Sequence, residues 1–212
     1  MSNKLSYFPI SHRENKVQII CLVIAVVYIL FTCGFSSFFK ITPDSNALFL
    51  LIGKMALLKS VFTFLGIVSQ LMLYYYLQRQ FSLKRHWLRW LIIVEMVMMA
   101  LSYIAILVMP DVTWDNMYLH TYVNGAISLL SALVLFVIGI VLVAKFTGRL
   151  RLYGMMVLIT YVFELVTNYS LYYFYGGDSR IEILMNLTNY CLTALIIMQV
   201  VCLKLTMKEV NS

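Results

Sequence analysis

Glu164 is the residue of this sequence whose chemistry most needs an explanation, because it interrupts a long apolar run. Tyr161 precedes it by three residues, and Asn168 and Tyr172 follow it by four and eight residues. These spacings place the four side chains on one face of an α-helix. A carboxylate flanked by tyrosine hydroxyls and an amide can hydrogen-bond a polar solute and can offset a positive charge. The sequence therefore predicts a ligand-binding helix face here.

A second polar face follows in the next apolar run. It consists of Glu182, Asn186, Asn189 and Thr193, again at spacings of three and four residues. Two consecutive helices with such faces are expected to turn them toward a shared interior.

Lys59 is a further ionisable residue within an apolar run. Placing such a group inside a membrane costs about 2.5 to 3.5 kcal/mol on insertion scales, so each one is a candidate functional residue. Counting the helical rise puts Lys59 within about two turns of the depth of Glu164, which permits an ion pair. A fourth run contributes Asn124, Ser128 and Ser131 at helical spacing.

These residues predict an outward-facing polar cavity that binds a small-molecule ligand. Its candidate lining residues are Glu164, Asn168, Lys59, Asn186, Asn189, Tyr161, Tyr172 and Asn124. The competing interpretation is that the groups hold helices together through hydrogen bonds, each contributing about 0.6 to 2 kcal/mol. For a single asparagine the structural interpretation is preferred, whereas a cluster that includes a lysine and a glutamate favours a cavity.

Glu95 has a different predicted role, because it lies only about two helical turns from the end of its run. Arg89 and His86 are close to it in sequence. We expect Glu95 to pair with a basic side chain near the membrane interface.

The sequence gives little support for metal binding or catalysis. The three histidines, His12, His86 and His120, are far apart and form no H-x-x-x-H pair, so neither a metal nor another cofactor is expected. No Ser or Cys has a nearby base, so an enzyme is not expected, and an intramembrane lipid-acting enzyme is the least supported function. The cysteines lie in apolar segments and are interpreted as small buried residues: Cys21, Cys33, Cys191 and Cys202.

The composition places these groups in a membrane protein. Of the 212 residues, 62% are hydrophobic and only 12% are charged, which is far from the values of soluble domains. The net charge of +7 comes largely from basic clusters between apolar runs, so a lipid bilayer rather than nucleic acid is the expected partner.

Six apolar runs are long enough for a helix that crosses a bilayer, for which about 20 residues suffice. The sequence thus predicts an all-α bundle of six transmembrane helices in a single membrane domain covering 1–212. The predicted helices are 17–38, 47–77, 88–109, 121–145, 151–175 and 181–204.

Basic residues alternate between the connections and so predict the orientation. The two tails and the second and fourth connections hold Lys4, Arg13, Lys16, Arg79, Lys84, Arg85, Arg89, Lys145, Arg149, Arg151, Lys204 and Lys208, whereas the other three connections hold only Lys40 and Arg180. Basic residues favour the cytoplasmic side, so both termini are predicted to be cytoplasmic, in the plasma (inner) membrane.

The expected function is therefore the binding or transport of a small solute. The alternative is a membrane-embedded sensor or an accessory subunit of a larger complex. All five connections are too short for a soluble domain, so a cytoplasmic or membrane partner subunit would have to supply any ATP-hydrolysing or signalling unit.

Overall fold

The computed structural model describes residues 6–30, 46–108, 117–173 and 179–209, with side chains over 6–30, 61, 63–104, 122–123, 125–167 and 187–209. Six long helices and two short strands follow one another along the described chain. They are β1 (Phe8–Ile10), α1 (His12–Ile29), α3 (Asn46–Leu83), α4 (Leu88–Val108), α5 (Met117–Lys145), α6 (Gly148–Tyr173), α7 (Ser179–Leu205) and β2 (Met207–Glu209). The all-helical prediction is confirmed for the bulk of the chain. Among the residues whose side chains are described, three segments are long and apolar enough to cross a membrane, namely Gly125–Lys145, Gly148–Thr167 and Leu187–Leu205.

Helix α1 begins five residues before the predicted position of residue 17. Ser11 caps it: the Ser11 hydroxyl accepts a hydrogen bond from the backbone N–H of Glu14 at 3.3 Å, and a Glu14 carboxylate oxygen accepts from the N–H of Ser11 at 3.1 Å. This reciprocal capping box satisfies two N–H groups at the helix terminus, and so extends the helix into a polar stretch.

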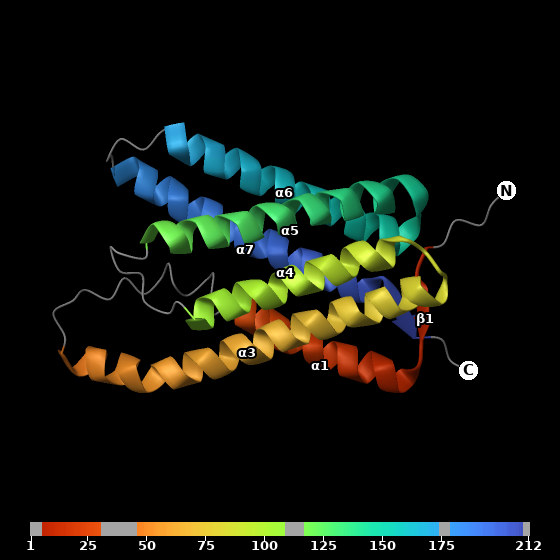
Figure 1. The fold of residues 1–212 in the computed structure, drawn as a ribbon, viewed down its shortest axis with the longest axis horizontal. Helices are drawn as coiled ribbons and strands as arrows, with labels where there is room; N and C mark the ends of the chain where they lie inside the picture. Colours follow the sequence, from red (N-terminus) through yellow and green to blue (C-terminus); the bar gives the residue numbers. More distant parts are fainter. Residues whose placement is uncertain (1–5, 31–45, 109–116, 174–178, 210–212) are drawn as a thin grey trace.

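The helices form a bundle in which sequence neighbours pack on one another. Helix α1 packs on α3, α3 on α4, α4 on α5, α5 on α6 and α6 on α7, while α7 also contacts α1 and α3. In Figure 1 the α6 and α7 pair and the beginning of α3 diverge toward the end opposite the chain termini.

The other end of the bundle holds β1 and β2, the connections 84–87 and 146–147, and both chain ends (Figure 1); we call it the strand end. The two strands pair in parallel, with Phe8 opposite Met207 and Ile10 opposite Glu209. These strands are not predicted from the sequence. Their pairing joins the first and last described segments of the chain.

An aromatic side chain from β1 seals the strand end. Phe8 is fully buried, and its ring lies edge-on to that of Phe81 at a centroid distance of 5.0 Å. Phe81 in turn packs edge-on against Phe146, at 5.6 Å. The segment continues across the bundle, because the carbonyl of Ser6 accepts a hydrogen bond from the N–H of Leu150 at 3.1 Å.

Polar side chains at the surface also hold β1 and β2 in place. Glu209 in β2 contacts His12 Nδ1 at 2.6 Å and accepts from Asn15 Nδ2 at 2.7 Å. Arg79 near the end of α3 forms an ion pair with Glu14 at 2.6 Å. These contacts connect α1, α3 and the C-terminal strand around β1.

Burial is unevenly distributed along the bundle. The fully buried large side chains lie toward the strand end and include Leu77, Phe81, Leu88, Ile138, Leu142, Leu150 and Leu203. Large apolar side chains of the opposite half are exposed, among them Val61, Phe64, Tyr122, Leu129, Leu130 and Val162. Leu83, Trp87 and Trp90 at the strand end are exposed as well, and α1 and α3 stay packed in the opposite half, where Ile29 and Gly66 are buried. In the described parts of α5, α6 and α7, burial is concentrated near the strand end, and we call the other half of these helices the open half.

Candidate functional site

Glu95 lies inside the bundle, on the buried face of α4. Leu88, Ile92 and Glu95 follow one another at spacings of four and three residues, so they share a helix face. All three are buried, and only 3% of Glu95 is exposed. The apolar members of this face fix its direction, and Glu95 must follow them into the interior.

Ser131 meets Glu95 from the neighbouring helix α5. Its hydroxyl lies 2.8 Å from one carboxylate oxygen of Glu95 and 3.0 Å from the other. Ser131 continues the buried face of α5 formed by Val134, Ile138 and Leu142. One hydroxyl group therefore bridges both oxygens of the carboxylate.

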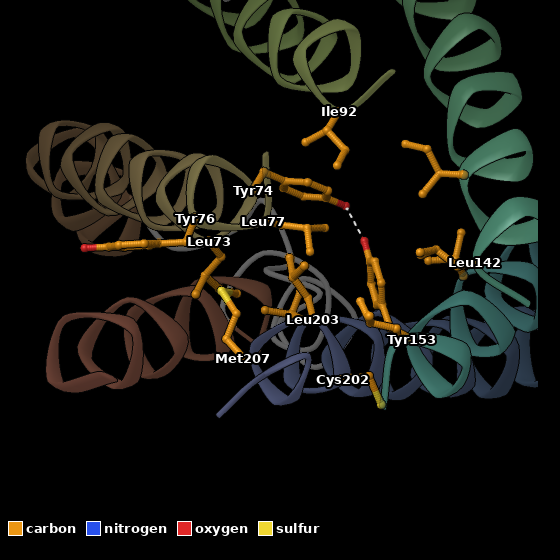
Figure 2. Close-up of a cluster of buried hydrophobic side chains, with 14 of the residues drawn as sticks. Leu73, Tyr74, Tyr76, Leu77, Ile92, Leu142, Tyr153, Cys202, Leu203 and Met207 are labelled. Atoms are coloured by element: carbon orange, nitrogen blue, oxygen red, sulfur yellow. Dashed lines mark hydrogen bonds between the residues drawn. The ribbon is translucent and has the colours of Figure 1, made fainter. Parts of the chain in front are cut away.

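Two buried tyrosines, Tyr74 in α3 and Tyr153 in α6, lie in the same polar part of the interior. The hydroxyl of Tyr153 donates to that of Tyr74 at 3.2 Å, and Figure 2 shows the two hydroxyls pointing at one another among apolar side chains. Both tyrosines are buried. The side chain of Gln199 in α7 lies beside both hydroxyls, and Glu95 is near enough to act on both electrostatically.

These five residues from five helices form what we call the Glu95 cluster: Glu95, Ser131, Tyr74, Tyr153 and Gln199. Among the described side chains, no Lys, Arg or His forms an ion pair with Glu95. A buried carboxyl group without a cation is costly to keep charged, so such groups in membrane bundles generally mark functional positions.

The structure corrects the expectation that Glu95 pairs near the interface. The guanidinium of Arg89 lies over the ring of Trp90, 5.0 Å from its centroid. His86 Nδ1 accepts from the N–H of Leu88 at 3.2 Å. His86 lies in the connection before α4 and Arg89 in the first turn of α4, whereas the helix turns Glu95 toward α5.

Glu164, which the sequence placed at the centre of the predicted cavity, lies on an exposed part of α6. Its neighbours Val162, Leu165 and Val166 are exposed as well. Thr167 donates a hydrogen bond to the backbone oxygen of Glu164 at 3.0 Å. The carboxylate has no hydrogen-bonding side chain among the described ones.

The other predicted site residues are only partly described. Tyr161 packs on α5, with its ring centroid 5.1 Å from that of Phe136. Asn189 is exposed on α7, while Thr193 of the same polar face is buried and donates to the Asn189 carbonyl at 2.7 Å. The side chains that lie outside the described residues are those of Lys59, Asn124, Asn168, Tyr172 and Asn186.

Metal-ligating groups do not gather within the described residues. No group of three or more His, Cys, Asp or Glu side chains occurs there. Cys21 and Cys202 are buried and Cys191 is exposed, all three as free thiols, and Cys33 lies outside the described residues. The Glu95 cluster is thus the principal concentration of buried polar chemistry in the described bundle.

The sequence contained part of the signal for this cluster. Ser131 belongs to the predicted polar face of α5, together with Ser128 and Asn124. Glu95 and Gln199 carry no such periodic signal, because apolar residues occupy the positions three and four residues before and after them. Gln70 and Gln78 flank Tyr74 at helical spacing, and Arg149 precedes Tyr153 by four residues, but these residues do not point to the cluster. Comparison of the chain with models of protein families, with curated proteins and with solved structures finds no match.

Proposed function

We propose that this chain is a six-span membrane protein that binds or transports a small solute entering from the end opposite the strand end. The observation that carries the proposal is the asymmetry of the bundle. Aromatic and apolar side chains around Phe8 and Phe81 close the strand end, while the described side chains of α5, α6 and α7 in the other half are exposed or half-buried. A solute site that is open on one side and sealed on the other is the arrangement that a binding or transport protein requires.

Two exposed polar residues support a site in the open half. Glu164 lies 16 residues after Gly148, the start of α6, and Asn189 lies 16 residues before Leu205, the end of α7. At 1.5 Å per residue, both lie about 24 Å from the strand end of two helices that pack together. Glu164 would offset a positive charge on the solute and Asn189 would hydrogen-bond it.

The orientation belongs to the same proposal: the strand end, with both termini, faces the cytoplasm, and the protein resides in the plasma (inner) membrane. The basic residues of the described connections and helix ends support it, because Lys84, Arg85, Lys145, Arg149 and Lys208 all belong to the strand end. A fluorescent-protein fusion at the C-terminus should therefore fluoresce, and a periplasmic phosphatase fusion there should be inactive. Active phosphatase would contradict the orientation.

Solute binding can be tested on purified protein in lipid nanodiscs. A panel of amino acids, sugars, nucleosides, vitamins and short organic acids is screened for solutes that raise the thermal denaturation midpoint. We expect at least one solute to stabilise the wild type and Glu14→Gln, but not Glu164→Gln or Asn189→Ala. Glu14→Gln is a matched control, because it removes the same charge at the strand end. Equal stabilisation of Glu164→Gln, or no stabilising solute in the panel, would contradict the proposal.

A sensor or accessory subunit is the second candidate. Exposed tryptophans at the strand end, Trp87 and Trp90, stand beside basic residues and would suit a partner subunit at the membrane surface. Reconstituted proteoliposomes distinguish the two functions. A transporter moves the stabilising solute across the bilayer, whereas a sensor binds the solute without moving it.

A further inference from the structure

We propose that Glu95 binds a proton and that this proton is coupled to solute binding. This inference rests on the solute-binding function proposed above. In the protonation step, a proton from water at the open end joins a carboxylate oxygen of Glu95 and gives the neutral acid. When the Glu95 acid ionises again, the same proton returns to water and the carboxylate is restored.

The contacts of Glu95 suit both protonation states. A serine hydroxyl has one hydrogen to donate and lone pairs that accept. Ser131 lies within hydrogen-bonding distance of both carboxylate oxygens. It can therefore donate to the ionised carboxylate, and after a rotation of its hydroxyl it can accept from the protonated acid. The pair needs no rearrangement of helices to gain or lose a proton.

The described surroundings of Glu95 do not form a metal site, because no group of three or more His, Cys, Asp or Glu side chains occurs there. Ile92, one turn before Glu95, is fully buried, and the hydroxyls of Tyr74 and Tyr153 are hydrogen-bonded to one another (Figure 2). A proton needs no such set of ligands, because it binds to a single carboxylate oxygen. No described basic side chain supplies the missing charge instead.

The groups facing Glu95 come from each neighbouring helix of the cluster. The titratable ones are Tyr74 from α3 and Tyr153 from α6, while α5 contributes Ser131 and α7 contributes Gln199. Serine and glutamine side chains do not titrate in water, and tyrosine ordinarily titrates near pH 10. Glu95 is thus the group of the cluster that exchanges a proton most readily.

The open half of the bundle provides the route for the proton. Ser128 lies one turn before Ser131 on α5 and is exposed, while Ser131 is half-buried. Toward the strand end, the cluster is covered by fully buried apolar residues, including Leu88, Leu142 and Leu150. Proton exchange is therefore expected from the open end.

Infrared difference spectroscopy tests proton binding without any solute. Protein in nanodiscs is titrated with acid and base, and the C=O stretching band of a buried protonated carboxyl group is followed. We expect a titrating band in the wild type and in Glu14→Gln, and loss of that band in Glu95→Gln. A band that persists in Glu95→Gln, or the absence of any such band from the wild type, would overturn the proposal.

A second variant provides a test that does not depend on whether Glu95→Gln folds. Ser131→Ala retains the acid but removes its hydroxyl partner, so the band should remain with a shifted midpoint. An unchanged midpoint would contradict the role given to Ser131.

Coupling to the solute is measured separately. If the binding of one proton is coupled to the binding of one solute molecule, the solute Kd changes by up to about tenfold per pH unit. This dependence should vanish in Glu95→Gln, which still binds the solute through the open half. A pH-independent Kd in the wild type would refute coupling, while leaving solute binding itself established.

Discussion

The hydroxyl of Tyr153 in α6 donates a hydrogen bond to the hydroxyl of Tyr74 in α3, with an oxygen to oxygen distance of 3.2 Å. The two helices are separated in sequence by α4 and α5. The bond therefore crosses the interior of the bundle, and both phenols are near enough to Glu95 to interact with it electrostatically. A polar contact in so apolar an environment holds two distant helices in one specific arrangement.

Removing this hydroxyl should weaken the bundle. We expect Tyr153→Phe to lower the free energy of unfolding by about 1 kcal/mol, the net contribution of a typical buried hydrogen bond. Tyr75→Phe is the matched control, because Tyr75 is adjacent to Tyr74 in sequence but exposed. Unfolding by SDS in mixed micelles, followed by circular dichroism, measures both variants. Equal stability of the two variants would show that the bond contributes nothing.

The seal at the strand end depends on Phe8. We expect Phe8→Ala to cost about 3 to 5 kcal/mol, because it leaves a cavity against Phe81. Hydrogen exchange should then speed up at the amides of β2 that pair with β1. Pro9→Ala is the control, since Pro9 points outward on the same strand. Unchanged exchange in Phe8→Ala would mean that its ring does not hold the strands together.

Apolar run length carries most of the predictable part of this fold. Each of the six predicted runs overlaps a long helix, and residues 31–38 of the first run lie outside the described residues. The ends differ where local side-chain chemistry acts, as at Ser11 and Glu14, whose reciprocal bonds start α1 early. The strands were not predictable, because three residues such as Phe8–Ile10 are too few to show periodicity. Their pairing depends on Met207–Glu209, at the other end of the chain.

The candidate site was harder to predict, for a reason that lies in α4. Its residues are apolar on nearly every side, so periodicity does not show which face is buried. Burial of Glu95 follows from the packing of Leu88 and Ile92 against neighbouring helices, which only the tertiary structure shows. Ser131 could be identified in advance, because it stands in a polar face at helical spacing. Glu95 stands out in the sequence as an ionisable residue in an apolar run, but its contact with Ser131 does not.

Acid should loosen the strand end. Hydrogen bonds from His12 and then Asn15 hold the pKa of Glu209 below its ordinary value of 4.5. A carboxylate with a lowered folded-state pKa stabilises the fold above its unfolded pKa, and this contribution is lost as the pH falls through the folded value. We therefore expect stability to decline below about pH 4.5.

Glu209→Gln tests this assignment, because it removes the titrating group and keeps an oxygen that can accept a hydrogen bond. The variant should be less stable than the wild type at neutral pH and should show a shallower decline in acid. Lys208→Gln, on the same strand, should keep the acid decline of the wild type. Denaturation midpoints between pH 3 and pH 7 give the comparison; parallel curves for Glu209→Gln and the wild type would rule out Glu209 as the source.

Two glycines, one in α3 and one in α5, test how closely different helices pack in the half opposite the strand end. A Cβ atom at Gly66 in α3 would overlap Cγ of Tyr28 in α1, so α1 and α3 approach closely at this point. We expect Gly66→Ala to destabilise the protein by about 1 to 3 kcal/mol through overpacking. At Gly125 in α5, a Cβ atom would meet nothing within 4 Å among the described residues. Gly125→Ala should instead stabilise the helix by up to about 1 kcal/mol, because alanine favours helices over glycine. SDS unfolding compares the two, and a loss of stability in Gly125→Ala would mean that the open half is occupied by packed groups.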